Sequence, residues 1–301
     1  MSDNDLVENT AKLKIFALVA DSYRVVFGNP GTMVRILWLP MALMGIVNFR
    51  FQDRNFQDLN AALQVDTDPA ALQAQLDAAF DPMFFIYMLV SWVVMCAVFV
   101  SLHRFVLLGE QPPTLGFTVR KREWRYLGYV IAILVTASVA MFVSMMGLII
   151  LELLVSALVG TEGAMVGILF FMVVLVLMVI SVTIYVRLGF VLPTIALDQE
   201  GGVRRRFKGA WALAKGNTLR MFVALFVASL PYMLIFGIWS YAFMQSVAEA
   251  MAMGSGFEPN MIITMVVFGV ISWLWYGVTI AMYSIAYRTL EPVGPQQQVE
   301  T

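Results

Sequence analysis

The distribution of basic residues constrains the fold of this chain more than any other sequence feature. About six long apolar runs divide the 301 residues, and of the 19 lysines and arginines all but Arg50 and Arg54 fall in, or at the edges of, every second gap between these runs. This alternation is typical of polytopic membrane proteins, because Lys and Arg concentrate in cytoplasmic loops. The pattern predicts an all-α membrane helix bundle with both termini in the cytoplasm.

The composition agrees with a membrane location. Apolar residues make up 60% of the chain and charged residues 13%, whereas soluble domains contain about 45–50% and about 25%. A surface this apolar would not stay dissolved in water. The amino-terminal sequence MSDNDLVENTAKLK is polar and acidic and lacks the basic and apolar regions of a cleavable secretory signal. We therefore expect the first membrane helix itself to direct insertion.

Six predicted spans cover the apolar runs. All except the first approach or exceed the about 20 residues that cross a hydrocarbon layer about 30 Å thick. The first is short and contains Pro40, which a helix bundle tolerates where neighbouring helices satisfy the freed carbonyl. The spans lie near 33–49, 83–107, 127–157, 164–191, 219–247 and 260–286.

The gaps between these spans differ in charge. The gap at 50–82 holds only two bases beside six aspartates, and those at 158–163 and 248–259 hold only glutamates. These are the predicted outer loops, whereas the basic gaps at 108–126 and 192–218 are predicted to be cytoplasmic. We expect residues 1–301 to form a single membrane domain that ends in a disordered cytoplasmic tail over 287–301.

Two cytoplasmic segments, 11–28 and 203–215, are predicted to form interfacial amphipathic helices. In the second, the basic side chains Arg204, Lys208 and Lys215 lie on one face at helical spacing. Such a face would meet anionic headgroups, and Trp211 suits the boundary layer. The apolar face consists of Val203, Phe207, Ala210, Trp211 and Ala214.

The same two segments suggest an internal repeat. Residues 22–29 align without gaps with residues 210–217, and both copies end in Gly-Asn, at Gly28 and Gly216. Each glycine is placed to end a helix in a left-handed conformation. A weaker counterpart, FTVRKREWRY at 117–126, precedes the third span. Three copies of one unit, made of an interfacial helix, an outward span, an outer loop and an inward span, would account for the pattern. Chemistry shared by segments at a membrane boundary would account for similarity this short as well.

One arginine stands at the cytoplasmic end of each even-numbered span: Arg104, Arg187 and Arg288. If these side chains converge, they could grip a lipid phosphate bidentately. Alternatively, they anchor the helix ends or pair with a nearby carboxylate. The candidate carboxylates are Glu110, Asp198 and Glu291.

Other polar residues within the apolar runs do not form a recognisable catalytic pattern. Cys96 is expected to be a small core residue, and His103, the only histidine, a hydrogen-bond donor at the membrane boundary rather than a metal ligand. Glu152 is expected near the outer surface, with a proton relay as the alternative reading. The sequence contains no phosphate-binding glycine loop, zinc-protease helix or serine nucleophile elbow. We predict no catalytic residue, cofactor or metal.

The segment RLGFVLPTIALDQEGG at 187–202, followed by FKGAWALAKGN at 207–217 and a further span, resembles a broad group of poorly characterised bacterial six-span proteins. That group is similar to the membrane domain that precedes some glycerophosphodiester phosphodiesterases, and the resemblance covers mainly residues 180–290. It implies a six-helix integral protein of the bacterial inner membrane. The phosphodiesterase barrel and its metal-binding acids are absent, so the resemblance implies no catalysis.

These observations favour a non-enzymatic membrane protein that engages anionic lipid, or a membrane partner, from the cytoplasmic side, with no nucleic-acid partner. The first alternative is a small-solute or lipid transporter, in which Pro40 and Pro231 could break helices at the midplane. The second is an intramembrane enzyme that uses His103, Arg104 and Glu110. The predicted lipid-headgroup contacts are Arg104, Arg187, Arg288, Arg204, Arg205 and Lys208.

Overall fold

The computed structural model of the chain describes residues 11–43, 45, 82–113, 118–159, 164–199, 202–253 and 259–291. Within these ranges every regular element is a helix, which confirms the predicted all-α class. Residues 30–43 are helical as well. The labelled helices are α1 (Ile15–Phe27), α4 (Pro82–Leu108), α5 (Lys121–Val159), α6 (Ala164–Gly189), α7 (Val191–Ala196), α8 (Val203–Leu213), α9 (Thr218–Met253) and α10 (Pro259–Leu290).

Several of these helices suit a bilayer. In the described part of the chain, four are long and apolar enough to cross a membrane: Met88–Leu108, Leu175–Ala196, Thr218–Glu249 and Ile263–Leu290. They coincide with the second, fourth, fifth and sixth predicted spans. The first predicted span is described only to residue 43 and at 45, and the third lies within α5. The chain therefore has the architecture of a multi-pass helical membrane protein.

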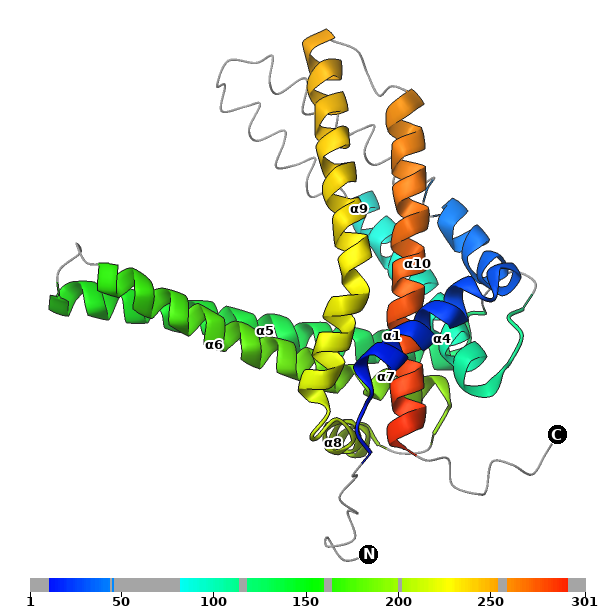
Figure 1. The fold of residues 1–301 in the computed structure, drawn as a ribbon, viewed down its shortest axis with the longest axis horizontal. Helices are drawn as coiled ribbons and strands as arrows, with labels where there is room; N and C mark the ends of the chain where they lie inside the picture. The colour runs from blue at the N-terminus through cyan, green and yellow to red at the C-terminus, as the bar shows by residue number, and fades with distance from the viewer. Residues whose placement is uncertain are drawn as a thin grey trace, which may run out of the picture.

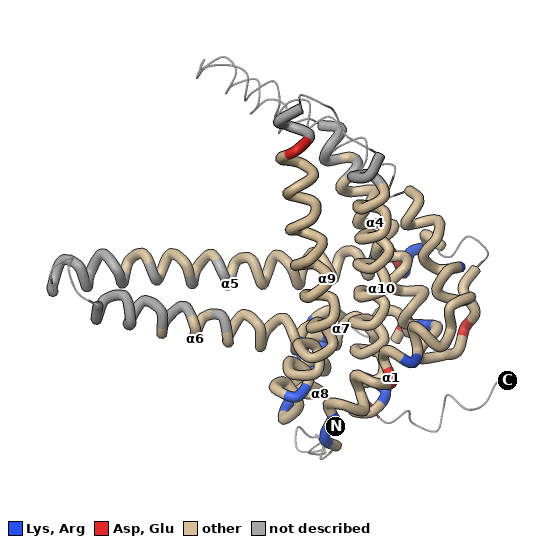
Figure 2. Tube along the Cα trace, turned by 45° about the horizontal axis from the view of Figure 1, so that its top comes forward, with Lys and Arg blue, Asp and Glu red and all other residues tan. Residues whose placement is uncertain are grey.

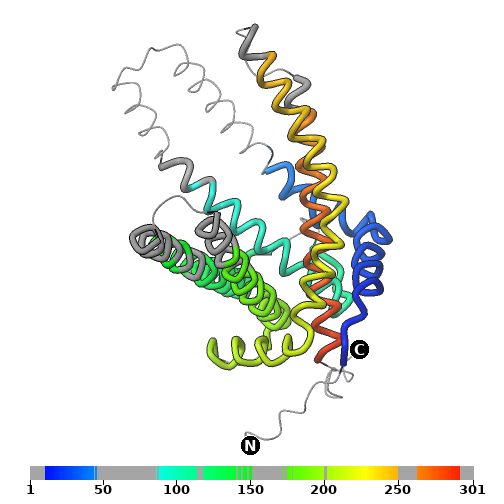
Figure 3. The backbone as a smooth tube through the Cα atoms, turned by 60° about the vertical axis from the view of Figure 1, so that its left-hand side comes forward, coloured from blue at the N-terminus to red at the C-terminus, as the bar shows by residue number. Residues whose placement is uncertain are grey.

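The helices form two arms that leave a common base (Figure 1). One arm is the α5–α6 hairpin and the other is the α9–α10 hairpin; each is a pair of helices packed side by side. We call base the region where α4, α6 and α10 end and α5 and α9 begin, together with α1, α7 and α8. The side view in Figure 3 shows the same two arms and places α8 across the base.

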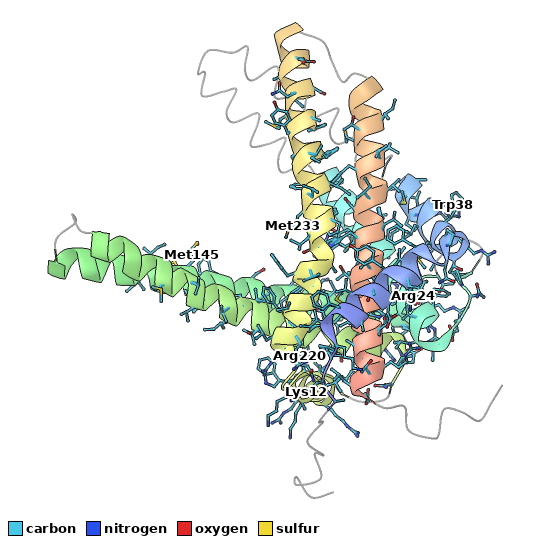
Figure 4. The ribbon with its side chains drawn as sticks, viewed as in Figure 1. Lys12, Arg24, Trp38, Met145, Arg220 and Met233 are labelled. Carbon is cyan, nitrogen blue, oxygen red and sulfur yellow. The ribbon has the colours of Figure 1, made fainter. Side chains whose placement is uncertain are left out.

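The buried core lies in the base. Its residues come mainly from the carboxyl-terminal parts of α4 and α10, the first turns of α5 and α9, α1, α7 and the helix over 30–43. Fully buried examples are Ile36, Tyr126, Phe190 and Met221. On the arms, by contrast, large apolar side chains are exposed, and Figure 4 shows Met145 and Met233 there, away from the base. This distribution fits a protein whose arms meet lipid rather than water.

Lysines and arginines are also found at the base rather than on the arms. Figure 2 shows Lys and Arg at the base, while the described outer parts of both arms carry none. Lys12 and Arg220 both lie at the base in Figure 4. The lysines and arginines that are unevenly spaced along the sequence are therefore gathered at one end of the described structure.

Helix α1 does not lie apart from the bundle as an independent surface helix. It packs across α10 and α9 (Figure 1), with Leu18, Ser22 and Val26 buried. The segment just before α1 is also held against the protein. The side chain of Asn217 accepts a hydrogen bond from the Leu13 amide (3.0 Å) and donates one to the Ala11 carbonyl (3.0 Å). Helix α1 thus covers Ile15–Phe27 of the predicted segment 11–28, residues 11–14 are not helical, and the buried face of the helix meets protein.

Some local expectations need correction. Gly216 has the predicted left-handed conformation (φ +77°), but Gly28 has φ −78° and caps α1 in a right-handed conformation. The segment 117–126 does not form a separate helix; α5 begins at Lys121 and continues into the arm. Pro231 lies inside α9 without interrupting it.

The prediction of a disordered tail over 287–301 is wrong for residues 287–290, because α10 continues to Leu290. Its hydrogen-bonded backbone keeps residues 287–290 helical, and the remainder from 292 on lies outside the described residues. The predicted outer loops at 50–82, 158–163 and 248–259 fall largely outside them as well.

Candidate functional site

Helix α8 carries half of the predicted lipid-contact residues, Arg204, Arg205 and Lys208, at the base. It starts after the extended residue Gly202 and is followed by a turn that closes at Gly216. Ala210 and Ala214 are buried, and the Phe207 ring lies 5.7 Å from that of Tyr129 in α5. The predicted apolar face of α8 is therefore packed largely against the protein.

The basic residues of α8 divide into two sets. Arg204, Arg205 and Lys208 are exposed, as is Lys215 in the following turn. Arg206 points inward: its guanidinium lies 5.7 Å from the centre of the Tyr129 ring, and it donates a hydrogen bond to the Gln199 carbonyl. Helical spacing could have revealed this difference, because Arg206 is four residues before the buried Ala210.

Arg187, at the end of α6, joins α8 to α9. Its guanidinium lies 4.5 Å from the centre of the Trp211 ring, and its Nε donates to the hydroxyl of Thr218 (2.9 Å). A cation over a Trp face is attracted by the quadrupole of the ring. Within the described residues Arg187 forms no ion pair with a carboxylate, so it holds two helices without being neutralised.

Arg104, at the end of α4, has the opposite surroundings. Both oxygens of Glu110 accept from its guanidinium, with Nε to Oε2 at 2.6 Å, and its Nη1 donates to the Ala196 carbonyl (3.0 Å). In this bidentate pair the carboxylate already occupies the guanidinium N–H donors that a lipid phosphate would need. The predicted alternative of carboxylate pairing is therefore confirmed for Arg104.

This pair belongs to a larger cluster of charges. Asp198 lies 4.0 Å from Nη1 of Arg104 and 3.2 Å from Nη1 of Arg122. Arg122 also donates to Glu123 (3.0 and 3.2 Å), whose other oxygen accepts from the Arg120 amide (2.9 Å). Asp198 adopts φ +53°, the left-handed region that aspartate tolerates better than most residues. The cluster neutralises its own cations and ties α4, α5 and the end of α7 together.

Arg288 completes the predicted set of helix-end arginines, but it is exposed on the last turn of α10. Arg104 and Arg187 contact different partners: Arg104 binds Glu110 and the Ala196 carbonyl, and Arg187 contacts Trp211 and Thr218. The convergence of the three arginines on one phosphate stays a prediction.

His103 lies beside Arg104 in sequence but faces the other way. It is fully buried, with Nδ1 2.7 Å from Oγ of Ser284 and Nε2 3.1 Å from Oη of Tyr126. Because Ser284 donates its only hydroxyl proton to the Ile280 carbonyl (2.9 Å), it accepts from Nδ1–H, and Tyr126 then donates to Nε2. His103 is thus a hydrogen-bonding residue as predicted, but within the core, and it does not join Arg104 and Glu110 in one site.

Sequence reasoning missed both partners of His103. Ser284 and Tyr126 were available as polar residues near the same helix ends, but a single sequence contains nothing that pairs positions 181 residues apart. Cys96 is buried in the core as expected. The side chain of Glu152 lies outside the described side chains. Within the described residues, no group of His, Cys, Asp and Glu could hold a metal ion.

A polar pocket of about 230 Å³ opens between α7, α8 and the end of α10. Its polar lining includes Thr194, Gln199, Arg205, Arg206, Tyr287 and Glu291. The hydroxyl of Tyr287, which is buried, lies 2.8 Å from Nε2 and 3.1 Å from Oε1 of Gln199. Partial burial raises the pKa of the Glu291 carboxyl, and a hydrogen bond from Gln199 opposes that shift. The sequence alone does not predict this pocket, because its lining residues are far apart along the chain and meet only in the folded protein.

A second hollow, of about 390 Å³, is an apolar groove between α4 and α5. Its lining includes Leu89, Trp92, Leu134 and Val139, with Ser138 as a polar member. An acyl chain would match this lining, because it offers the groove nothing but apolar surface.

Together, the long apolar helices and the lysines and arginines gathered at the base define a helical, multi-pass membrane protein. Comparison of the chain with family models, curated proteins and solved structures gives no match.

Proposed function

We propose that the chain is a six-span protein of the bacterial inner membrane, non-enzymatic, and that its base faces the cytoplasm and holds anionic lipid. The basic end of the molecule supports this orientation through the positive-inside rule. The two spans needed beyond the four long apolar helices would be 33–49 and the part of α5 over 127–157. Both termini would then be cytoplasmic, because an even number of spans returns the chain to the side on which it began.

One observation supports lipid contact above all: the outward cations of α8 are not neutralised by the protein. Arg204, Lys208 and Lys215 are exposed and form no ion pair within the described residues, whereas Arg104 and Arg122 are each paired with carboxylates. Each cation near an anionic membrane surface contributes about 1 kcal/mol. Exposed Val203 and Trp211 on the same helix would reach the boundary layer.

The test uses the full protein reconstituted in phosphatidylcholine vesicles that contain trace spin-labelled phosphatidylglycerol or phosphatidylcholine. The motionally restricted fraction of each label gives the relative affinity for the anionic lipid. We expect the wild-type protein to prefer phosphatidylglycerol, and the variant R204Q/K208Q/K215Q to lose most of that preference. Added salt should weaken it in the same direction, because surface charge is screened.

The matched control is R204K/K208R/K215R, which keeps all positive charges and should keep the preference. An unchanged preference in the Gln variant would remove the proposal. If the preference for phosphatidylglycerol falls equally in the control, the preference depends on side-chain packing rather than on charge.

A lipid transporter is the second candidate, and the apolar groove between α4 and α5 favours it over a small-solute transporter. The check is the rate at which fluorescent lipid exchanges between leaflets of proteoliposomes. Transport requires a faster rate than in empty vesicles, and S138W, which would fill the groove, should slow it.

A further inference from the structure

The two arginine clusters at the base differ in how their charge is balanced. At the corner of α4 and α5, Arg104 and Arg122 face Glu110, Glu123 and Asp198, so acids outnumber bases. In the pocket between α7, α8 and α10, Arg205 and Arg206 form no ion pair within the described residues, although Glu291 lines the same pocket. The pocket therefore offers positive charge to a ligand, and the corner does not.

Arg206 is held in place but incompletely bonded. The Gln199 carbonyl and the Tyr129 ring fix its guanidinium from two sides, while its Nε is buried and has no hydrogen-bond partner. Leaving a buried donor of a charged group unpaired is costly. An anionic oxygen bound in the pocket would supply the missing acceptor, and guanidinium forks suit phosphate oxygens.

Neighbouring groups narrow the ligand class. Tyr287, buried at 4% exposure, presents a hydroxyl beside Gln199. Glu291 would repel a bare anion but would accept hydrogen bonds from an amine or hydroxyl close to the phosphate. The volume of about 230 Å³ is below the roughly 300–1,000 Å³ typical of sites for drug-sized molecules. A small headgroup fits these limits better than a nucleotide.

We propose that this pocket binds a phosphate ester with a hydrogen-bond-donating substituent, such as phosphoethanolamine or phosphoglycerol. The proposal deepens the lipid-contact function and rests on it in one respect, that the base faces a lipid surface. Arg205 and Arg206 would bind the phosphate and Glu291 would accept from the substituent, while the hydroxyl of Tyr287, which accepts from Nε2 and donates to Oε1 of Gln199, would hold that side chain in place at the pocket. Phosphocholine has no N–H to donate, so it should bind more weakly.

The experiment is calorimetric titration of the full protein in a nonionic detergent with phosphoethanolamine, glycerol 3-phosphate, phosphocholine and inorganic phosphate. R206Q and Y287F should each weaken phosphoethanolamine binding, the first by more than about tenfold, as expected for loss of a charged hydrogen bond. E291Q should reduce the preference for phosphoethanolamine over phosphocholine. Y287F preserves the ring packing, so it keeps the test valid if R206Q fails to fold.

The matched control is R125Q, which removes the same charge from an exposed position on α5 that has no part in the proposed binding surfaces. It should leave binding within about twofold. Equal losses in R125Q and R206Q, or no saturable binding of any probe, would overturn the proposal. Because R206Q and Y287F leave the outward cations intact, the spin-label preference should survive in them, so failure of the pocket and failure of the surface function are distinguishable.

A last comparison separates a lipid from a free ester. Dihexanoyl phosphatidylethanolamine carries the same headgroup on short acyl chains. Tighter binding of this lipid than of phosphoethanolamine identifies the ligand as a lipid headgroup. Tighter binding of the free ester identifies it as a soluble metabolite, and either result supports the chemistry of the pocket.

Discussion

The base and the arms are built from the same kind of apolar helix, yet different contacts hold them. In the base, His103, Tyr126 and Ser284 from three helices satisfy one another, and Gly189 lets the Tyr283 ring approach the backbone. On the arms, each helix packs mainly against its partner in the hairpin, and large side chains such as Leu234 (67% exposed) and Phe142 (58%) face outward. Contacts within the protein thus fix the packing of the base, whereas the exposed apolar side chains of the arms depend on lipid to cover them.

The largest expected contrast between the two regions involves glycine. A Cβ added at Gly189 would lie 2.5 Å from the buried Tyr283 ring, whereas at Gly237, on the α9 arm, nothing lies within 4 Å. We expect G189A to lower the free energy of unfolding by about 1–3 kcal/mol through overpacking. G237A should raise it by up to about 1 kcal/mol, because alanine favours helix. Unfolding in mixed detergent micelles by added SDS measures both, and equal effects would contradict the contrast.

A serine pair gives a somewhat smaller effect. Ser284 and Ser246 each donate to the carbonyl four residues earlier, but only Ser284 also binds His103. S284A should cost about 1–3 kcal/mol in the same assay, because Nδ1 of His103 is then buried without an acceptor. S246A, on the arm, should be close to neutral. If S284T, which restores a hydroxyl, does not recover part of the loss, the hydrogen bond is not the cause.

The smallest effect concerns the two Gly-Asn sequences. Asn217 binds the backbone of Leu13 and Ala11, whereas Asn29, just after α1, donates to the carbonyl of Val25, four residues earlier in the chain. N217A should release the segment before α1 at a cost of about 1 kcal/mol. Hydrogen exchange at the Leu13 amide should then accelerate several-fold, and N29A should leave it unchanged. Equal exchange rates in the two variants would show that the segment is held by other contacts.

The sequence predicted the helices well because their causes are local. Apolar runs near Met88–Leu108 and Ile263–Leu290 are long enough to span a membrane on their own residues. The left-handed end at Gly216 was predictable for the same reason, since it depends on a few adjacent residues. The identical expectation at Gly28 was wrong, because the chain there turns directly into the next helix at 30–43.

The candidate site was predicted only in part. The exposed cations Arg204, Arg205 and Lys208 are placed by helical periodicity, and the pairing of Arg104 with Glu110 was one of the two readings of that arginine. The pocket was not predicted, because Gln199 and Tyr287 meet across 88 residues. Such a contact depends on how α7 settles against α10, and no local pattern encodes it.

By itself, the sequence determined that this chain is an all-helical membrane protein with its basic residues gathered at one end. Hydrophobic length and charge are additive along the chain, so they can be read without knowing any contact. Only the tertiary structure decided which arginines are neutralised: Arg104 by Glu110 and Asp198, and neither Arg187 nor Arg206 by any carboxylate among the described residues. The reason is physical, because ion pairing requires approach within a few ångströms, and that distance is set by helix packing rather than by sequence spacing.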